Sequence, residues 1–273
     1  MKTINLVGGG RVGQTLGRLL AQDGQVRVQD LLTRSAASAE QALAFIGSGR
    51  AVGNMQHMRP ADLWLLAVPD GQIAPVAKAL AACDSLPPAT VFHASGALGS
   101  ELLHPLRAKG WQVASAHCLL SFASPALALQ QFAGTPCALE GDAQALAELR
   151  ALFTRLGAQC FDVRAQDKML YHAGAIFATN FLPVLQDLAE QLWQQTGMPL
   201  PMVQHLRASL LHNAVNNLVA LGPQAALTGP AARGDSALVA AQGQAVQQWD
   251  STAGQAYQAL SALARSLAQR QHP

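Results

Sequence analysis

The chain has 273 residues, of which 50% are hydrophobic and only 12% are charged. This composition excludes intrinsic disorder, which requires low hydrophobicity and high net charge. The formal net charge is +2 at pH 7 and the basic residues form no cluster, so a nucleic-acid-binding protein is not expected. At roughly 150 residues per domain, the length suggests two domains.

From residue 1 to about residue 163, segments typical of strands alternate with segments typical of helices. This alternation predicts an α/β domain, residues 1–163, in which a doubly wound parallel sheet is wrapped by helices. Ser35 or Ser38 is expected to cap the second helix. The expected strands are residues 4–7, 26–32, 63–68, 90–93, 113–117, 137–139 and 160–163, and the expected helices are 11–22, 38–46, 74–82 and 143–156.

After Val163 the strand signals stop. Residues 167–195, 201–221 and 236–269 have the pattern of helices, separated by breaks at Gly197–Pro199, Gly222-Pro223 and Gly229-Pro230. The sequence therefore predicts an all-helical C-terminal domain, residues 164–273.

Two uncharged stretches, residues 110–139 and 169–186, raise the question of a membrane protein, because the first is long enough to span a bilayer. Both contain histidine, proline and amide side chains that would be costly in lipid, so we interpret both as buried protein interior. The N-terminus does not have the pattern of a signal peptide, and the four cysteines show no Cys-x-x-Cys spacing. These features predict a cytoplasmic protein with reduced, structural thiols and no membrane partner.

A glycine-rich segment, Gly8-Gly9-Gly10-Arg11-Val12-Gly13, follows the first strand and opens the first helix. This is the context that a dinucleotide-binding (Rossmann) motif requires. Gly8 would permit the tight turn, Gly10 would let the backbone approach a pyrophosphate, and Gly13 would let the helix lie close to the strand. The N–H groups at the helix start, at Arg11 and Val12, would receive the phosphates. A glycine-rich turn that binds nothing is the alternative.

The residues that follow the second strand bear on which dinucleotide is bound. NAD sites usually have an acidic residue about 20 residues after the glycines, and at that position this chain has Thr33-Arg34-Ser35. A cation between two hydroxyl side chains suits a 2′-phosphate, which predicts NADP. Two alternatives remain at this point: Asp30 binds the ribose of NAD, or Arg34 is merely solvated.

Two further turns follow buried strands, at the edge of the sheet where ligands bind in such folds. Val68-Pro69-Asp70 would form a rigid turn beneath the cofactor, although Asp70 would also suit a purely structural role as a helix cap. The segment from His93 to Gly96 lacks the Gly-x-Ser-x-Gly spacing of a nucleophile elbow. We therefore expect Ser95 and Gly96 to line the nicotinamide or the substrate.

These motifs, together with His117 followed by Phe122, resemble a bacterial family of Rossmann-like proteins with a C-terminal DUF2520 domain. In the second half the resemblance is carried by Tyr171-His172, Asn180, and Ala226–Pro230 followed by Arg233-Gly234-Asp235. The family usually has proline after the histidine, whereas this chain has Cys118. The family is similar to pyrroline-5-carboxylate, ketopantoate and 6-phosphogluconate enzymes, which implies an NADP-dependent oxidoreductase and identifies no substrate.

Hydride transfer to C=O or C=N needs a group that polarises or protonates the acceptor. His117 ends a strand at the sheet edge, and an imidazole with an ordinary pKa of about 6.5 can carry a proton at neutral pH. His172 and Asn180 lie eight residues apart, about 80° around a helix, so both can face one cleft. A core polar group with its hydrogen bonds satisfied is the alternative for each.

The loop between the later helices supplies two more candidates. Thr228 and Arg233 are polar residues in a charge-poor region, and Arg233 could hold a substrate carboxylate or phosphate. Asp235 is expected to cap the last long helix.

Three other residues are not expected to take part. Lys168 lies near the start of a helix and is expected to be solvated. Related sugar-acid dehydrogenases use a lysine three or four residues before an asparagine, but Ile176 and Phe177 occupy those positions here, so that mechanism is not expected. His205 and His212 could share a helix face, but no acidic third ligand accompanies them, so we expect a core or interface role and no metal.

The sequence thus predicts an NADPH-dependent reductase of a small carbonyl or imine compound, with the substrate between the two domains. The alternative is a non-catalytic NADP-binding sensor that keeps the fold. A homodimer through the helical domain is also expected, because apolar residues cover more than one face of one helix. These residues are Leu206, Leu210, Leu211, Val215, Leu218 and Val219.

Overall fold

The computed structural model describes residues 1–270. The chain forms two compact units, Met1–Thr179 and Asn180–Pro273, and each is described by itself. The last strand of the first unit ends at Asp162, and a further helical segment after it belongs to the same unit. The boundary after residue 163 stays a prediction.

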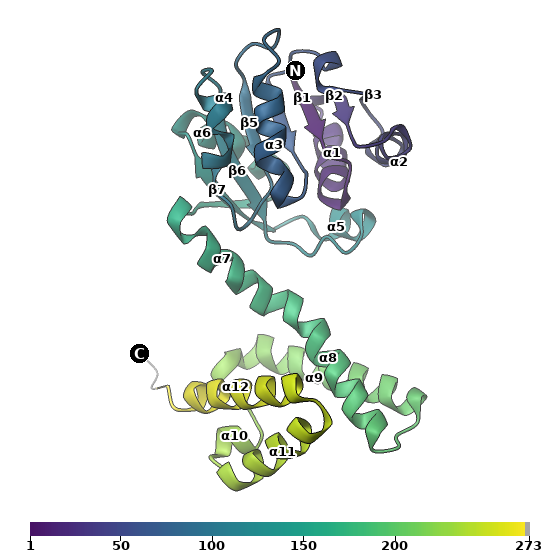
Figure 1. Ribbon diagram of the computed structural model, residues 1–273, viewed down its shortest axis with the longest axis vertical. Helices are drawn as coiled ribbons and strands as arrows, with labels where there is room; N and C mark the ends of the chain where they lie inside the picture. Colours follow the sequence, from purple (N-terminus) through teal and green to yellow (C-terminus); the bar gives the residue numbers. More distant parts are fainter. Residues whose placement is uncertain (271–273) are drawn as a thin grey trace. The chain divides into compact units, whose positions relative to one another are not determined.

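The first unit is built on one eight-stranded sheet with the order β3-β2-β1-β4-β5-β6-β7-β8 (Figure 1). All neighbouring strands are parallel except β6 and β7. The strand order reverses direction between β1 and β4, which is the point where open α/β sheets bind ligands. The strands are β1 Lys2–Val7, β2 Val26–Leu32, β3 Arg50–Val52, β4 Leu63–Leu66, β5 Thr90–His93, β6 Gln112–Cys118, β7 Pro136–Gly141 and β8 Gln159–Asp162.

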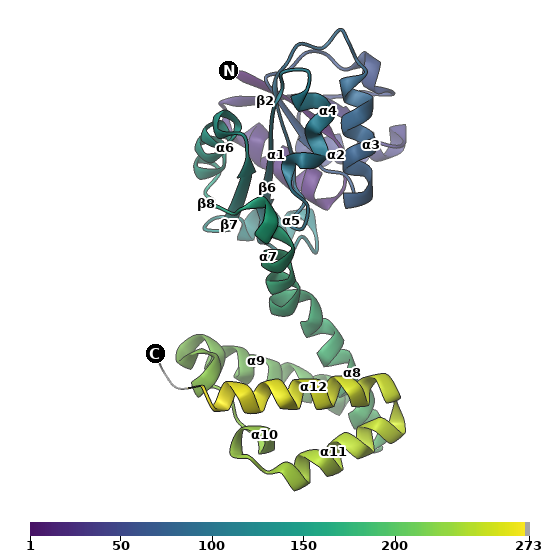
Figure 2. The same ribbon diagram turned by 60° about the vertical axis from the view of Figure 1, so that its left-hand side comes forward.

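Helices cover both faces of this sheet (Figures 1 and 2). The alternation of side chains along β4 shows why, since Leu63 and Leu65 join one buried cluster while Trp64 and Leu66 join the other. The first cluster contains side chains of α1, α2, α5 and α6, and the second contains side chains of α3 and α4. The helices of the unit are α1 Arg11–Asp23, α2 Ala36–Ile46, α3 Asp70–Ala81, α4 His104–Arg107, α5 Pro125–Gln131, α6 Ala143–Arg155 and α7 Lys168–Ala175, with short 3₁₀ turns at Met55–His57, Ser100–Leu103 and Ala165–Asp167.

The doubly wound α/β prediction is confirmed, with several differences in detail. The sheet is not wholly parallel, because β7 runs antiparallel to β6. Strand β3 was not predicted, since it has only three residues and no fully buried side chain. Helix α5 was also missed, although Ser124 caps it and Pro125 begins it. Of the two candidate caps for α2, Ser35 is the one that accepts a hydrogen bond, from the N–H of Ser38.

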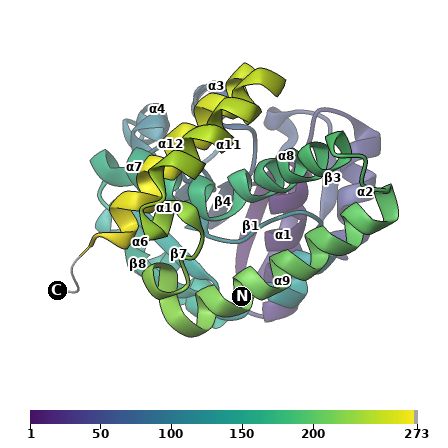
Figure 3. The ribbon, with the colours of Figure 1, turned by 90° about the horizontal axis from the view of Figure 1, so that it is seen from below.

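The second unit is helical, as predicted (Figure 3). Its helices are α8 Phe181–Gln195, α9 Leu200–Ala225, α10 Pro230–Arg233, α11 Ser236–Trp249 and α12 Ser251–Ala268, and a π-helical segment, Ile176–Asn180, precedes α8. Helix α9 is kinked at Gly222 (φ 74°, ψ 170°), directly before Pro223. A single helix over residues 236–269 was wrong, because Asp250 adopts an extended conformation and caps α12 through the N–H of Ala253.

No helix within residues 1–270 is both long and apolar enough to cross a membrane. The two uncharged stretches instead contain strands and helices of the two units.

Candidate functional site

The glycine-rich turn joins β1 to α1 at the carboxyl edge of the sheet. Gly8 has a positive φ of 108°, and a Cβ atom there would lie 2.2 Å from the carbonyl oxygen of Ala67. A Cβ atom on Gly13 would lie 2.3 Å from the carbonyl oxygen of Gly8. These two glycines are therefore required by the turn itself.

Gly10 differs from these two glycines. A Cβ atom on Gly10 would have no neighbour within 4 Å, and no side chain caps the start of α1. No side chain thus pairs with the first N–H groups of the helix, which carry the positive end of the helix dipole. This arrangement is suited to an anion.

Thr33, Arg34 and Ser35 follow β2 and precede α2. A Cβ atom on Gly9 would lie 2.9 Å from the methyl carbon of Thr33, so the two turns lie against each other. The Ser35 hydroxyl caps α2, and the Thr33 hydroxyl donates to the carbonyl of Ser35 at 2.7 Å. Arg34 is exposed, and its guanidinium group has no ion-pair partner within residues 1–270.

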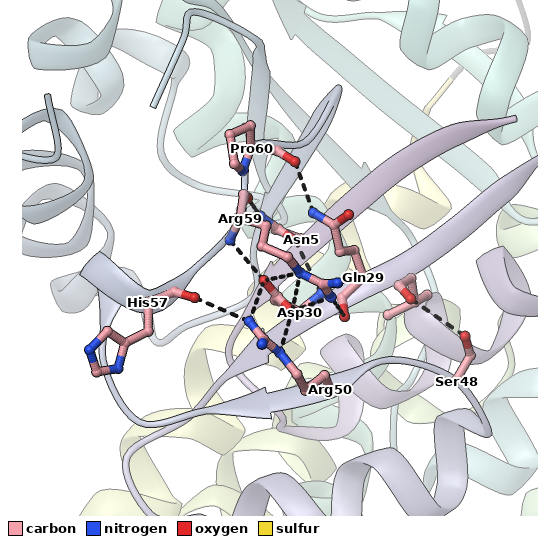
Figure 4. Close-up of polar contacts among 9 residues, drawn as sticks. Asn5, Gln29, Asp30, Ser48, Arg50, His57, Arg59 and Pro60 are labelled. Atoms are coloured by element: carbon pink, nitrogen blue, oxygen red, sulfur yellow. Dashed lines mark hydrogen bonds and ion pairs between the residues drawn. The ribbon is translucent and has the colours of Figure 1, made fainter. Parts of the chain in front are cut away.

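Asp30 lies inside β2, which continues to Leu32, and its side chain is fully buried. Its carboxylate is paired with Arg59 at 2.6 Å and with Arg50 at 3.1 Å (Figure 4). Burial alone would raise the pKa of Asp30, but the hydrogen bonds from Arg59 and Arg50 outweigh it and lower the pKa. A carboxylate held in this way is not free to bind a ribose, which disfavours the alternative NAD site.

Strand β4 ends at Leu66, two residues earlier than predicted, and the turn Ala67-Val68-Pro69 follows it. The carbonyl of Ala67 lies against Gly8, so this turn borders the glycine-rich turn. Asp70 was considered as a helix cap, but Pro69 occupies the cap position and Asp70 is the first residue of α3. An acidic residue there favours the helix through its dipole.

The turn after β5 is shaped by His93, which is fully buried. The Nε2 atom of His93 donates to the carbonyl of Gly99 at 3.0 Å, and its Nδ1 atom accepts from the N–H of Ser95 at 3.2 Å. The Ser95 hydroxyl in turn accepts from the N–H of Leu98. Burial lowers the pKa of His93, so a neutral imidazole holds Ser95 and Gly96 in place.

Two imidazoles pack against Gly96. A Cβ atom on this glycine would lie 2.5 Å from Nδ1 of His172, on α7, and 2.8 Å from Nε2 of His117, on β6. The ring centroids of the two histidines are 5.5 Å apart. Glycine is thus the residue that gives both rings room. The Nδ1 atom of His117 is hydrogen-bonded to the Tyr171 hydroxyl at 2.8 Å.

The surroundings of the two rings keep His117 neutral at pH 7 and, within residues 1–270, leave one ring nitrogen of His172 unpaired. Burial, followed by the nearby His172 and Lys168, lowers the pKa of His117 to about 4. The Nδ1 atom of His172 is buried and has no hydrogen-bond partner within residues 1–270. Because buried polar atoms are normally paired, this unpaired nitrogen is an exception that calls for a reason.

Lys168 was missed by the sequence reasoning, and the expectation that it is solvated is wrong. Its side chain is fully buried, and its Nζ atom donates to the Ser95 carbonyl at 3.1 Å and to the Ser115 hydroxyl at 2.7 Å. The available signal was the polar pair Ser115 and Glu140, which lie opposite each other in the otherwise apolar strands β6 and β7. Two buried polar residues in such strands call for a buried partner.

Cys118 stands where the resemblance leads us to expect proline, and β6 continues to this residue. The N–H of Leu119 donates to the carbonyl of Pro136, which makes Cys118 and Cys137 a pair that exchanges no backbone hydrogen bonds. The N–H of residue 118 is therefore not needed by β7, so cysteine and proline are both compatible with this position. All four cysteines are free thiols.

The second unit contains Asn180, Thr228 and Arg233, all exposed within the chain. Asp235 caps α11 by accepting from the N–H of Leu238, as expected. His205 and His212 are exposed on α9, so a core role within the chain is wrong for both. The described part of the chain has no group of three His, Cys, Asp or Glu side chains placed to hold a metal ion.

The structure thus brings Ser95, Gly96, His117 and His172 together in the first unit. β1, β4, β5 and β6 are parallel neighbours, so the turns after the first three and His117 near the end of β6 share one edge of the sheet. The contribution of Asn180, Thr228 and Arg233 to the same site stays a prediction.

Solved structures of similar fold include oxidoreductases. Protein TM1727 from Thermotoga maritima is 26% identical, with a TM-score of 0.76, and the match covers 97% of this chain and 98% of that one. BF3122 from Bacteroides fragilis, a suggested NADP oxidoreductase, is 19% identical, with a TM-score of 0.78 and the same coverage. Pyrroline carboxylate reductase from Plasmodium falciparum, with NADP bound, is 11% identical, with a TM-score of 0.59 and 98% of each chain covered. The fold is therefore one that NAD(P)-dependent oxidoreductases use.

Among curated proteins, none matches this sequence. Residues 2–118 match the family model of a Rossmann-like domain, and residues 135–264 match that of DUF2520, a domain of unknown function. The chain therefore combines a Rossmann-like domain with a DUF2520 domain that follows it.

Proposed function

We propose that this protein is an NADPH-dependent reductase that transfers a hydride to the C=O or C=N group of a small substrate. The observation that carries the proposal is the pair of imidazoles, His117 and His172, packed on Gly96 at the same sheet edge as the glycine-rich turn. Ligands of open α/β sheets bind at this edge. A purely structural pair would be expected to satisfy its ring nitrogens, yet Nδ1 of His172 has no partner within residues 1–270.

The cofactor part of the proposal rests on the two turns after β1 and β2. The open space at Gly10 and the uncapped start of α1 fit a pyrophosphate, which Arg11, Val12 and the neighbouring glycines would bind through their N–H groups. The exposed guanidinium group of Arg34, with Thr33 and Ser35 beside it, fits a 2′-phosphate. Similar folds in an NADP-bound reductase and a suggested NADP oxidoreductase support the same cofactor.

The turns after β4 and β5 would border the rest of the cofactor. Val68, Pro69 and Asp70 would lie beneath it, and Ser95 and Gly96 would lie beside the nicotinamide. When bound, NADPH supplies the hydride. The protein's own task is to bind and polarise the acceptor atom of the substrate, so that the hydride and a proton from water can add across the C=O or C=N bond.

His117 and His172 are suited to that task. Because the pKa of His117 lies at about 4, its imidazole is neutral at pH 7 and polarises the substrate oxygen or nitrogen through a hydrogen bond. His172 offers its free Nδ1 atom to the same substrate atom or to its neighbour. Asn180, Thr228 and Arg233 are kept as proposed substrate contacts, with the exposed Arg233 binding a carboxylate or phosphate.

The test is to measure NADPH oxidation by the purified protein against a panel of small keto acids and cyclic imines. We expect turnover of at least one class of substrate, and we expect His117→Asn to lower kcat by about 100-fold, within the range of general acid–base contributions. His205→Asn, at an exposed position on α9, is the matched control and should keep wild-type activity. An NADPH-induced rise in Tm with no turnover on any substrate would instead indicate the non-catalytic sensor.

A further inference from the structure

Lys168 is a charged residue that the contacts proposed above with cofactor and substrate do not involve. It is the first residue of α7, and its side chain is fully buried. An ammonium group is costly to bury unless polar partners surround it. The identity of those partners indicates what the residue does.

The Nζ atom of Lys168 donates to the Ser115 hydroxyl at 2.7 Å, and this hydroxyl donates to Glu140 at 3.2 Å. Glu140 also accepts from the N–H and the hydroxyl of Ser100, both at 2.7 Å. A single serine thus links the buried ammonium group to a buried carboxylate. That carboxylate in turn fixes the start of the 3₁₀ turn Ser100–Leu103, which follows the turn after β5.

The second partner of Lys168 is the carbonyl oxygen of Ser95, at 3.1 Å. The N–H of the same residue donates to His93. The peptide groups on both sides of Ser95 are therefore held, one by a neutral imidazole and the next by an ammonium group. The network fixes both ends of the segment from Ser95 to Ser100.

This segment carries Gly96, against which His117 and His172 pack so closely that even a Cβ atom would not fit. A small displacement of the segment would therefore move both imidazoles. We infer that Lys168 is a positioning residue, whose buried ammonium group holds the Ser95–Gly96 turn against His117 and His172. The inference rests on the proposed reductase function for its catalytic meaning, whereas its physical test does not require turnover.

The charge of Lys168 also acts on His117. Burial is the main cause of the lowered pKa of His117, and the nearby His172 and Lys168 lower it further. The groups that face His117 are His172 and Tyr171 from α7 together with this lysine. Burial lowers the pKa of Lys168 itself, and the negative charges of Glu140, Glu101 and Asp70 oppose this by favouring its ammonium form. A neutral side chain in place of Lys168 would make it easier to add the second proton to the His117 imidazole, and the pKa of His117 would rise.

The test uses the full chain and follows the titration of His117 by NMR, with its ring signal assigned by its loss in His117→Asn. Lys168→Met keeps a long apolar side chain but removes the charge and the donor. We expect it to raise the titration midpoint of His117 by about one pH unit. Lys168→Arg should restore a low midpoint, and Lys78→Met, at an exposed position on α3, is the matched control.

An unchanged His117 midpoint in a folded Lys168→Met protein would overturn the inference. Should Lys168→Met fail to fold, Lys168→Gln keeps a donor without the charge and is expected to raise the midpoint in the same way. If both neutral variants fail to fold while Lys168→Arg folds, the role of the lysine is purely structural. That result would also overturn the inference.

Turnover provides the second readout. If the protein reduces a substrate, Lys168→Met should lower kcat by about 10-fold with little change in the KM for NADPH, because the positioned groups act on the substrate. On the acidic side of its pH–rate profile, the pH at which kcat falls should rise together with the NMR titration midpoint of His117. If the wild type reduces no substrate, the reductase proposal fails, and the titration of His117 still decides the role of Lys168.

Discussion

Arg34 is the residue on which the choice between NADP and NAD depends. It is exposed, follows β2, and has no ion-pair partner within residues 1–270, while Asp30 is already paired with Arg59 and Arg50. We expect Arg34→Ala to weaken NADPH binding by about 10-fold or more, because a hydrogen bond to a charged group contributes roughly 1.5–3 kcal/mol. Binding of NADH should hardly change.

Calorimetric titration of the wild type and variant with both cofactors measures this difference. Arg27→Ala, at an exposed position at the start of the same strand, is the matched control. Equal losses for NADPH and NADH would contradict the assignment, since they would point to a change in the fold of the site.

His117 links the site to the pH dependence of stability. Its pKa of about 4 in the folded protein lies below the ordinary value of about 6.5, so between these pH values the unfolded chain binds more protons than the folded one. The folded protein should therefore lose stability as the pH falls from about 6.5 to about 4. His117→Asn removes the titrating group and should make this decline smaller.

Urea unfolding at a series of pH values from 7 to 4 checks the prediction, with His205→Asn as a control at an exposed position on α9. The same pH slope in His117→Asn and in the wild type would show that other groups cause the decline.

The turn between β1 and α1 contains glycines that the structure requires for different reasons, and substitutions there should therefore have different effects. A side chain at Gly10 would enter open space, whereas a side chain at Gly13 would meet the carbonyl of Gly8 at 2.3 Å. Gly10→Val should therefore fold with a Tm close to that of the wild type and lose NADPH binding, because its side chain enters the space of the pyrophosphate. Gly13→Ala should lower the Tm itself.

Thermal unfolding with and without NADPH separates the two effects. A folded Gly10→Val protein that still bound NADPH with wild-type affinity would exclude this turn as the phosphate site.

The exposed surface of the helical unit bears on the oligomeric state of the whole molecule. Several apolar side chains of α9 are exposed in the single chain, with Val219 82% exposed and Leu218 49% exposed. Exposed apolar surfaces of this kind usually mark an interface, and a two-fold dimer is the commonest arrangement. We expect light scattering at micromolar concentration to give about twice the chain mass of 28.6 kDa.

A variant sharpens this test. Val219→Glu places a charge on the exposed apolar surface of α9 and should shift the equilibrium toward the monomer. Leu127→Glu, at an exposed apolar position on α5, should leave the mass unchanged. A monomer in the wild type at micromolar concentration would contradict the prediction of a dimer.

Local pattern was enough for the sequence to predict most of the strands and longer helices and the glycine-rich turn. Strands β2 and β5 begin and end at the predicted residues, because an apolar run bounded by turn residues is a property of neighbouring positions. The same holds for Gly8–Gly13, whose spacing between a strand and a helix is visible without any structure. The resemblance added the family, and residues 135–264 match the model of the DUF2520 domain that it named.

Tertiary structure alone decided which polar groups are buried and what they contact. The hydrogen bond from Lys168 to Ser95 joins residues 73 positions apart, and the pairing of Asp30 with Arg59 joins residues 29 positions apart. No periodicity in the sequence encodes such contacts, since they arise only when separate strands and helices pack against one another. The lowered pKa of His117 has the same origin, because burial and the charge of distant Lys168 act through space and not along the chain.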